Sequence, residues 1–271
     1  MTKVIVHAGF HKTGTTSLQN FLGQNRNQLA PYFTYYGKAD FLHAGANARL
    51  YGQRPYYWRL IRFRRSFRRF LNSIPDAPVI ILSRETFSGV MPGHRDVRGR
   101  TIQNQTDVAI TLAREIHAGL IKRFGAATQV EFIYTTRDTE SWIRSVYGHL
   151  LRSIHLTDDY DAFRAGFPTL AGPDQTTATI ARALAPIPVH TARLADYADI
   201  PAGPADAILQ LAGVPDEATA ALKPATRANA GQSLELEQQF LALNRSTQDK
   251  VRLKTLKDQM IREAAGTHDN G

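Results

Sequence analysis

The sequence predicts an α/β fold: a central parallel sheet, helices on both of its faces, and a P-loop-like first strand, loop and helix. Short runs of β-branched and aliphatic residues at 3–8, 78–83 and 129–134 indicate buried strands of a parallel sheet. Segments with apolar residues at helical spacing separate these runs. No proline- or serine-rich linker divides the 271 residues. We therefore expect a single domain over 1–271, with a disordered tail from about residue 265.

The first strand, at 3–8, leads into a glycine-bounded loop with the sequence G-F-H-K-T-G-T-T-S, and a helical pattern follows. A helix start offers unpaired backbone N–H groups and a partial positive charge. Glycines let the backbone approach an anion, and hydroxyl groups and a lysine add further donors. This order predicts a phosphate site, whose candidate residues are Gly9, His11, Lys12, Thr13, Gly14, Thr15, Thr16 and Ser17.

The spacing of Gly9 and Gly14 matches the opening of a Walker A motif, but Thr15 stands where that motif has its lysine. The lysine is instead Lys12, inside the loop, so the magnesium-holding pattern is broken while phosphate-binding groups remain. One alternative is a P-loop kinase or nucleotide hydrolase. Another is a plain helix start in which Thr16 and Gln19 form a capping box.

Two segments before the second strand are rich in aromatic residues. Residues 31–55 contain several glycines, and we expect an irregular segment that either forms a wall for an acceptor or packs over the sheet edge. Residues 58–71, W-R-L-I-R-F-R-R-S-F-R-R-F-L, predict an amphipathic helix with arginines over most of its outer face. That face is a solvated surface, a docking face for an anionic acceptor or a nucleic-acid-binding surface.

The second strand, at 78–83, runs into Arg84 and Glu85 at its carboxyl end. Ligands collect beyond the carboxyl ends of strands in open α/β sheets, so Glu85 is a candidate general base. The other interpretation is an acidic partner for Arg84 or another arginine. The alternative bases are His94, His117 and His149.

The third strand, at 129–134, ends close to Arg137, and a predicted helix at 139–152 follows. Ser145 lies eight residues after Arg137, within that helix. A guanidinium fork suits a phosphate dianion, and a hydroxyl group can complete its shell. Taken alone, Arg137 could equally be an arginine that caps the edge of the sheet, and Ser145 an ordinary serine within a helix.

The remaining pattern is less informative about function. It predicts a loop at 158–177 and a basic loop at 223–232 that contains Arg227. It also predicts a mobile loop at 89–106, helices at 107–124, 175–184 and 205–211, a strand at 187–191 and one long helix at 233–264.

The loop H-K-T-G-T-T-S and the Arg137–Ser145 spacing, supported by Glu85, resemble the sulfotransferases that use 3′-phosphoadenosine 5′-phosphosulfate (PAPS). The resemblance implies that Lys12 approaches the bridging oxygen between phosphate and sulfate. It implies that Arg137 and Ser145 hold the 3′-phosphate, with Arg227 in a late loop over it. It also implies that Glu85 is the catalytic base and that no metal takes part.

The chain departs from the cytosolic branch of this family, which has a tryptophan after the loop threonines and a histidine base. It is closer to bacterial and carbohydrate-directed members. The resemblance therefore implies sulfuryl transfer to an acceptor hydroxyl on a carbohydrate or glycolipid.

The net charge of +9 favours anionic partners: nucleic acid, a membrane surface, an acidic glycan or a charged nucleotide. A non-catalytic nucleic-acid-binding protein that uses the arginine helix is thus a further alternative. The chain has no cysteine, which excludes disulfides and thiolate metal sites. No run approaches the ~18 apolar residues of a membrane span, and no signal-peptide pattern is present. We expect a cytoplasmic enzyme that binds a nucleotide donor and a hydroxyl acceptor, and no nucleic acid. Its oligomeric state is left open.

Overall fold

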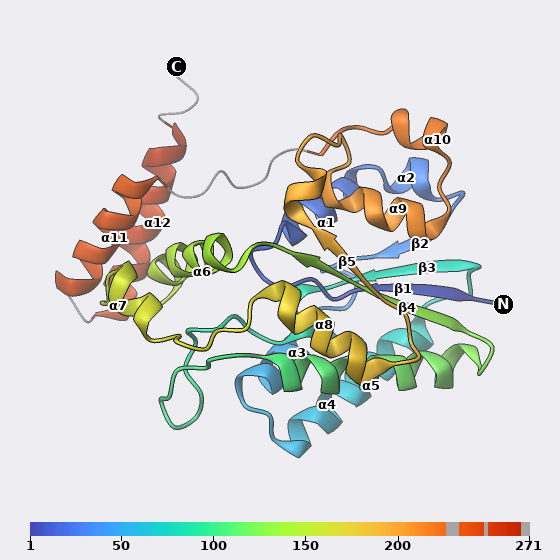
Figure 1. Cartoon of the computed structure of the whole chain (residues 1–271), viewed down its shortest axis with the longest axis horizontal. Helices are drawn as coiled ribbons and strands as arrows, with labels where there is room; N and C mark the ends of the chain where they lie inside the picture. Colours follow the sequence, from blue (N-terminus) through green and yellow to red (C-terminus); the bar gives the residue numbers. More distant parts are fainter. Residues whose placement is uncertain (226–232, 247–248, 267–271) are drawn as a thin grey trace. The chain divides into compact units, whose positions relative to one another are not determined.

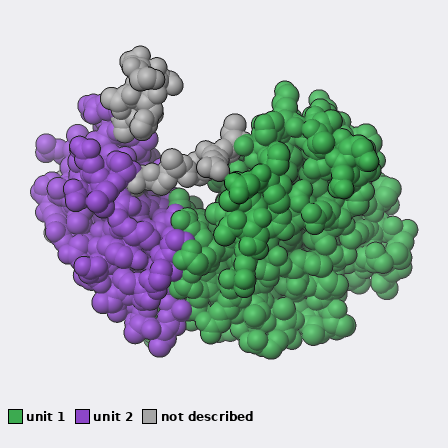
Figure 2. All heavy atoms as spheres, turned by 45° about the horizontal axis from the view of Figure 1, so that its top comes forward, with its two compact units in different colours: residues 1–139, 171–228 green, residues 140–170, 229–271 purple. Residues whose placement is uncertain are grey.

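The computed structural model describes residues 1–225, 233–246 and 249–266. The chain divides into two compact units, which Figure 2 shows in different colours: residues 1–139 with 171–228, and residues 140–170 with 229–271. The first unit contains the sheet and the predicted phosphate loop. Within the described ranges, no helix combines the length and the apolar character needed to cross a membrane.

In the described part of the first unit, five strands form one all-parallel sheet in the order β2-β3-β1-β4-β5 (Figure 1). β1 is central, and its last residue, His7, lies beside Ser83 of β3 and Ile133 of β4. A parallel sheet is buried on both faces, which explains the continuous apolar runs of its central strands. The strands are β1 (Lys3–His7), β2 (Thr34–Tyr36), β3 (Val79–Ser83), β4 (Gln129–Thr136) and β5 (Val189–Arg193).

Helices cover both faces of this sheet. Val4 and Val6 of β1 belong to a core with α3, α4, α5 and α8, whereas Ile5 belongs to a second core with α1, α2 and α9. The division follows from the alternation of side chains along a strand. The helices of this unit are α1 (Thr15–Gln24), α2 (Arg26–Leu29), α3 (Leu42–Gln53), α4 (Tyr57–Ser73), α5 (Thr106–Phe124), α8 (Pro173–Leu184), α9 (Asp206–Ala212) and α10 (Asp216–Ala220), with the 3₁₀ turns η1 (Glu85–Ser88), η2 (Leu194–Tyr197) and η3 (Gly203–Ala205). The predicted fold class is confirmed.

The second unit is helical. The ammonium group of Lys257 donates hydrogen bonds to the carbonyl oxygens of Leu151 (2.7 Å) and Ile154 (3.0 Å). Burial lowers the pKa of Lys257 to about 8. The Asn244 amide donates to the carbonyl oxygens of Leu151 (3.2 Å) and Leu156 (2.8 Å). These bonds satisfy carbonyl groups at and beyond the end of α6, which lack partners within the helix. The helices are α6 (Thr139–Ser153, from residue 140 in this unit), α7 (Tyr160–Ala165), α11 (Leu234–Ser246) and α12 (Lys250–Gly266).

The expectation of an irregular segment at 31–55 is wrong, because the segment contains β2 and α3. β2 has only three residues, too few for its alternation to be recognised. α3 buries mainly small residues, which give a weak helical pattern. A Cβ atom at Gly45 would lie 2.4 Å from Nε of Arg84, and one at Gly52 would lie 3.0 Å from Cα of Gly89. These glycines therefore serve close packing inside a helix.

Two further expectations about the chain's later part are wrong. The predicted loop at 158–177 contains α7 and the start of α8. Asp159 caps α7, and its side chain accepts a hydrogen bond from the backbone N–H of Ala162 (3.0 Å). The predicted single helix at 233–264 is divided into α11 and α12. The predicted tail falls mostly on residues 267–271, which lie outside the described residues.

Candidate functional site

The predicted phosphate loop is the turn between β1 and α1. Lys12 has a φ of 69° and Gly14 a φ of 88°, and Lys12 is the only non-glycine with a positive φ among the described residues. This conformation costs a non-glycine residue roughly 1–2 kcal/mol. α1 begins after Gly14 without a side-chain cap, so Thr16 and Gln19 form no capping box. Such a helix start is suited to an external anion.

Gly9 lies against three polar side chains that leave no room for a Cβ atom. A Cβ built there would lie 2.4 Å from Nε2 of His7, 2.6 Å from Oγ1 of Thr135 and 2.8 Å from Oγ1 of Thr15. The hydroxyl groups of Thr13 and Thr15 donate to the carbonyl oxygen of Phe10, at 2.7 and 3.0 Å. These two hydroxyl groups hold the loop in shape. Thr16 is exposed, and His11, Lys12 and Ser17 are half-buried.

Gly9→Ala is expected to lower the free energy of unfolding by about 1–3 kcal/mol, because the added methyl group overpacks this junction. Thermal unfolding would measure the loss. Gly23→Ala is the matched control, since a Cβ atom at Gly23 of α1 meets nothing within 4 Å. That control is expected to raise stability by roughly 0.5–1 kcal/mol, because alanine favours a helix interior over glycine. Equal melting temperatures for the two variants would contradict the packing argument.

Three adjacent strands end in polar residues beneath the loop. His7 of β1 places Nδ1 2.7 Å from Oγ of Ser83 on β3 and Nε2 3.3 Å from Oγ1 of Thr135 on β4. Oγ1 of Thr135 lies 2.8 Å from Oγ1 of Thr13. Burial lowers the pKa of His7 to about 4, so its ring is neutral at pH 7. The network joins the loop to both strands that flank β1.

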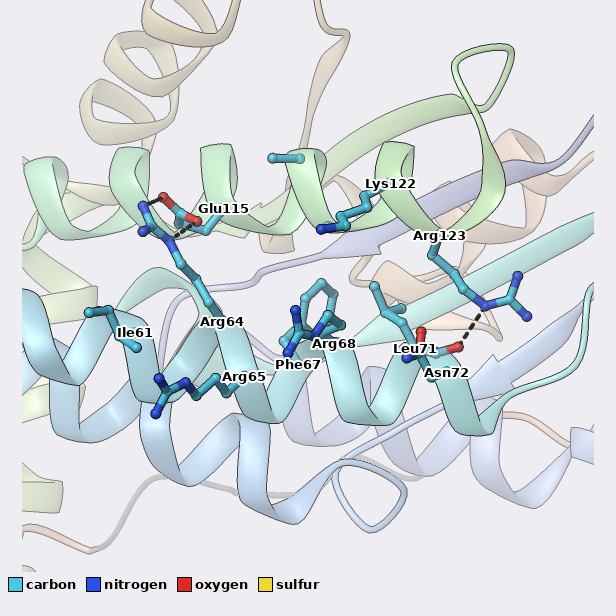
Figure 3. Close-up of a pocket in the computed structure, with 12 residues that line it drawn as sticks. Ile61, Arg64, Arg65, Phe67, Arg68, Leu71, Asn72, Glu115, Lys122 and Arg123 are labelled. Atoms are coloured by element: carbon cyan, nitrogen blue, oxygen red, sulfur yellow. Dashed lines mark hydrogen bonds and ion pairs between the residues drawn. The ribbon is translucent and has the colours of Figure 1, made fainter.

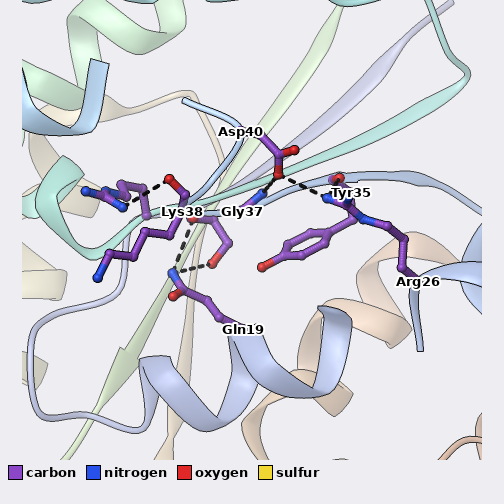
Figure 4. Close-up of polar contacts among 8 residues, drawn as sticks. Gln19, Arg26, Tyr35, Gly37, Lys38 and Asp40 are labelled. Carbon is purple, nitrogen blue, oxygen red and sulfur yellow. Dashed lines mark hydrogen bonds and ion pairs between the residues drawn. The ribbon is translucent and has the colours of Figure 1, made fainter. Parts of the chain in front are cut away.

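Glu85 opens η1, two residues beyond the end of β3. Nε2 of Gln19, on α1, donates to Oε2 of Glu85 at 3.3 Å and also to the carbonyl oxygen of Ser83 at 3.3 Å. Figure 4 shows Gln19 reaching from its helix to the end of this strand. The helix that follows the phosphate loop thus also holds the candidate base.

The charge state of Glu85 follows from its neighbours. Burial raises the pKa of this half-buried carboxyl group, but His11, Arg84 and the hydrogen bond from Gln19 lower it, and the net result lies below the ordinary value. Burial lowers the pKa of His11 to about 4, although Glu85 opposes the shift. At neutral pH the site therefore holds an ionised carboxylate beside a neutral imidazole.

Arg84, the alternative partner of Glu85, is buried and donates elsewhere. Its Nε donates to Oγ1 of Thr86 (3.2 Å) and its Nη1 to the carbonyl oxygen of Lys38 (3.3 Å). Its charge still lowers the pKa of Glu85. Arg84 therefore affects Glu85 through its charge, whereas its hydrogen bonds go to Thr86 and to the backbone of Lys38.

Arg49 was missed by the sequence-based reasoning. It is an exposed residue of α3, and its positive charge contributes to the lowered pKa values of His11, His94 and Arg84. It therefore lies within electrostatic reach of the loop and of the end of β3. No signal marked it, because α3 itself was not predicted.

The predicted 3′-phosphate residues lie in different parts of the molecule. Arg137 is half-buried and directly follows β4, which contacts the loop: Oγ1 of Thr135 on β4 lies 2.8 Å from Oγ1 of Thr13. Ser145 is half-buried on α6, in the second unit. Their cooperation stays a prediction, and Arg227 lies outside the described residues.

The three alternative bases differ in their surroundings. His94 is half-buried, burial and Arg49 lower its pKa, and its own charge affects His11. His117 lies on α5, where burial lowers its pKa, and His149 belongs to the second unit. Among the three, His94 is the one whose charge contributes to the lowered pKa of His11 in the loop.

The structure thus places the predicted loop, the carboxylate of Glu85 and Arg137 at the carboxyl edge of one sheet, where an anionic ligand could be held and a proton accepted. Among the described residues, no group of three or more histidine, aspartate and glutamate side chains is arranged to hold a metal ion. No protein-family model and no curated protein matches this chain.

Proposed function

We propose that this protein transfers a sulfuryl group from PAPS to an acceptor hydroxyl on a carbohydrate or glycolipid. The observation that carries the proposal is the link made by α1. Its N-terminus closes a loop that holds Lys12 in a left-handed conformation, and its Gln19 holds the carboxylate of Glu85. A phosphate-binding turn and a proton acceptor are thereby attached to one rigid helix.

The residues present fit the donor. Gly9 is buried and has no room for a side chain, so the turn packs tightly there, and α1 starts without a side-chain cap. The loop amides and Lys12 would hold the 5′-phosphosulfate. Arg137 would bind the 3′-phosphate, with Ser145 and Arg227 as the partners that the resemblance implies.

In the proposed reaction, the acceptor oxygen forms a bond to sulfur as the bond between sulfur and the bridging phosphate oxygen breaks. Glu85 takes the proton of the acceptor hydroxyl, and the electron pair of the broken bond remains on the departing phosphate. Lys12 and the loop amides stabilise the charge that develops there. The pKa of Glu85 rises when anionic groups are bound beside it, which makes the carboxylate a stronger base in the complex.

Nucleotide binding tests the proposed donor. Adenosine 3′,5′-bisphosphate is expected to bind at least ~10-fold more tightly than AMP, because each charge-assisted hydrogen bond to the 3′-phosphate contributes ~1.5–3 kcal/mol. Titration calorimetry without magnesium would measure both affinities. Arg137→Ala is expected to remove most of the difference. Equal affinities in the wild-type protein, or binding that requires magnesium, would instead favour a P-loop kinase or hydrolase.

A further inference from the structure

The outer face of α4 is strongly basic. Its sequence contains six arginines and no acidic residue. Trp58, Arg62, Arg65 and Arg69 recur at intervals of four, three and four residues, so they form one stripe along the helix. The opposite face is buried in the core and includes Phe63 and Phe67. Because this apolar face packs in the core, the stripe on the other side of α4 faces outward.

A groove of about 740 Å³ runs beside this stripe, between α4 and α5 (Figure 3). Arg64 forms an ion pair with Glu115, and Arg123 forms one with Asp76 at 2.8 Å. Three other cations line the groove, and within the described part of the chain no hydrogen bond or ion pair engages them: Arg65, Arg68 and Lys122. The groove is thus built to receive negative charge from outside the protein.

Exposed aromatic rings lie at the N-terminal end of the same helix. Tyr57 is 69% exposed and Trp58 is 47% exposed. The guanidinium carbons of Arg59 and Arg62 each lie 4.9 Å from the Trp58 ring centroid. Aromatic rings accompanied by arginines are typical of protein surfaces at the boundary between water and lipid.

We propose that the α4–α5 face, with Tyr57, Trp58 and the cations Arg65, Arg68 and Lys122, docks the protein on an anionic membrane surface. Lipid headgroup phosphates would occupy the basic groove, and the two aromatic rings would enter the interfacial layer. Each basic residue near such a surface raises partitioning roughly fivefold. The proposal is independent of the nucleotide site.

A single-stranded nucleic acid is the competing occupant of this face. Proteins that bind single strands stack the bases on open aromatic faces. Here Arg59 and Arg62 already lie over the Trp58 ring. These guanidinium groups compete with a stacked base for the ring, which disfavours a single strand as the occupant.

Sedimentation with vesicles tests the proposal. The protein is expected to bind phosphatidylcholine vesicles that contain phosphatidylserine and not vesicles of phosphatidylcholine alone, and added salt is expected to weaken binding. The triple variant Arg65→Glu, Arg68→Glu, Lys122→Glu is expected to bind at least ~10-fold more weakly. The control Arg152→Glu, Arg182→Glu, Arg252→Glu changes the net charge equally at exposed positions outside α4 and α5 and is expected to bind like the wild type.

Tryptophan fluorescence tests the aromatic end separately. The chain has two tryptophans, and Trp142 is buried. In Trp142→Phe, the emission of Trp58 is expected to shift to shorter wavelength on phosphatidylserine vesicles, and in Trp58→Phe the shift is expected to vanish. Unchanged vesicle binding by the folded groove variant would overturn the proposal. Tighter binding to single-stranded RNA than to these vesicles would also overturn it and would assign the face to nucleic acid.

Discussion

Replacing Lys12 with alanine is expected to reduce sulfuryl transfer by ~10²–10³-fold, as the loss of one preorganised charge-stabilising donor does in other enzymes. Binding of adenosine 3′,5′-bisphosphate is expected to weaken far less. The reason is that the ammonium group acts mainly on charge that develops as the phosphate departs, and such an interaction contributes to the rate more than to ground-state affinity. Turnover with labelled PAPS and calorimetric affinity for the product nucleotide give the two quantities.

The backbone at Lys12 needs a control of its own, because its φ of 69° is unfavourable for alanine as well as for lysine. Lys12→Gly removes the same ammonium group and adopts this conformation without strain. Both variants are expected to lose transfer to the same extent. A loss confined to Lys12→Ala would show that loop conformation, and not the charge, is responsible. Wild-type turnover in both variants would remove Lys12 from the mechanism.

Most of the sheet was predictable, because a central parallel strand is buried on both faces and reads as a continuous apolar run. β1, β3 and β4 have this property, and all three were predicted. The division between α11 and α12 had a weaker signal: Oδ1 of Asp249 accepts hydrogen bonds from the N–H groups of Val251 (2.9 Å) and Arg252 (3.1 Å). An aspartate at that position is a helix start, but no glycine or proline marked the break.

The candidate site was predictable where its residues are contiguous in the chain or stand directly at a strand end, as Glu85 and Arg137 do. The loop at Gly9 to Ser17 could be found because strand, glycines and helix follow one another. The contacts beneath it join residues far apart: His7 and Ser83 are separated by 76 positions, and His7 and Thr135 by 128. Only the order of the strands brings them together. The position of Arg49 near the loop depends in the same way on the packing of its helix, α3, against η1, where Oγ1 of Thr86 donates to the carbonyl oxygen of Gly45.

The hydrogen bond from Gln19 to Glu85 could not be expected from sequence either, since the sequence equally allows Gln19 to form a capping box with Thr16. Its actual position makes it a positioning residue for the proposed base. The bond joins the helix that follows the predicted phosphate loop to the end of β3, so it links the position of the carboxylate to that of the loop helix. This coupling is the reason to test Glu85 with a substitution that preserves the hydrogen bond.

Glu85→Gln is expected to lower turnover by ~10²–10⁴-fold and to leave nucleotide affinity nearly unchanged. The glutamine keeps a side-chain oxygen that can accept from Gln19, but it cannot take the proton of the acceptor hydroxyl. Because the pKa of Glu85 lies below its ordinary value, the wild-type carboxylate is ionised at neutral pH, and the substitution removes a group that is already in its active form. Turnover, calorimetric affinity and melting temperature should be measured together.

The same substitution separates catalysis from a structural role. If Glu85 serves mainly as a charge partner for Arg84 and its other cationic neighbours, Glu85→Gln lowers the melting temperature and leaves transfer partly intact. His94→Ala is the matched comparison, because His94 is the alternative base linked electrostatically to the loop through His11. It is expected to retain transfer if Glu85 is the base. Near-normal transfer by Glu85→Gln, together with an inactive and folded His94→Ala, would assign proton removal to His94.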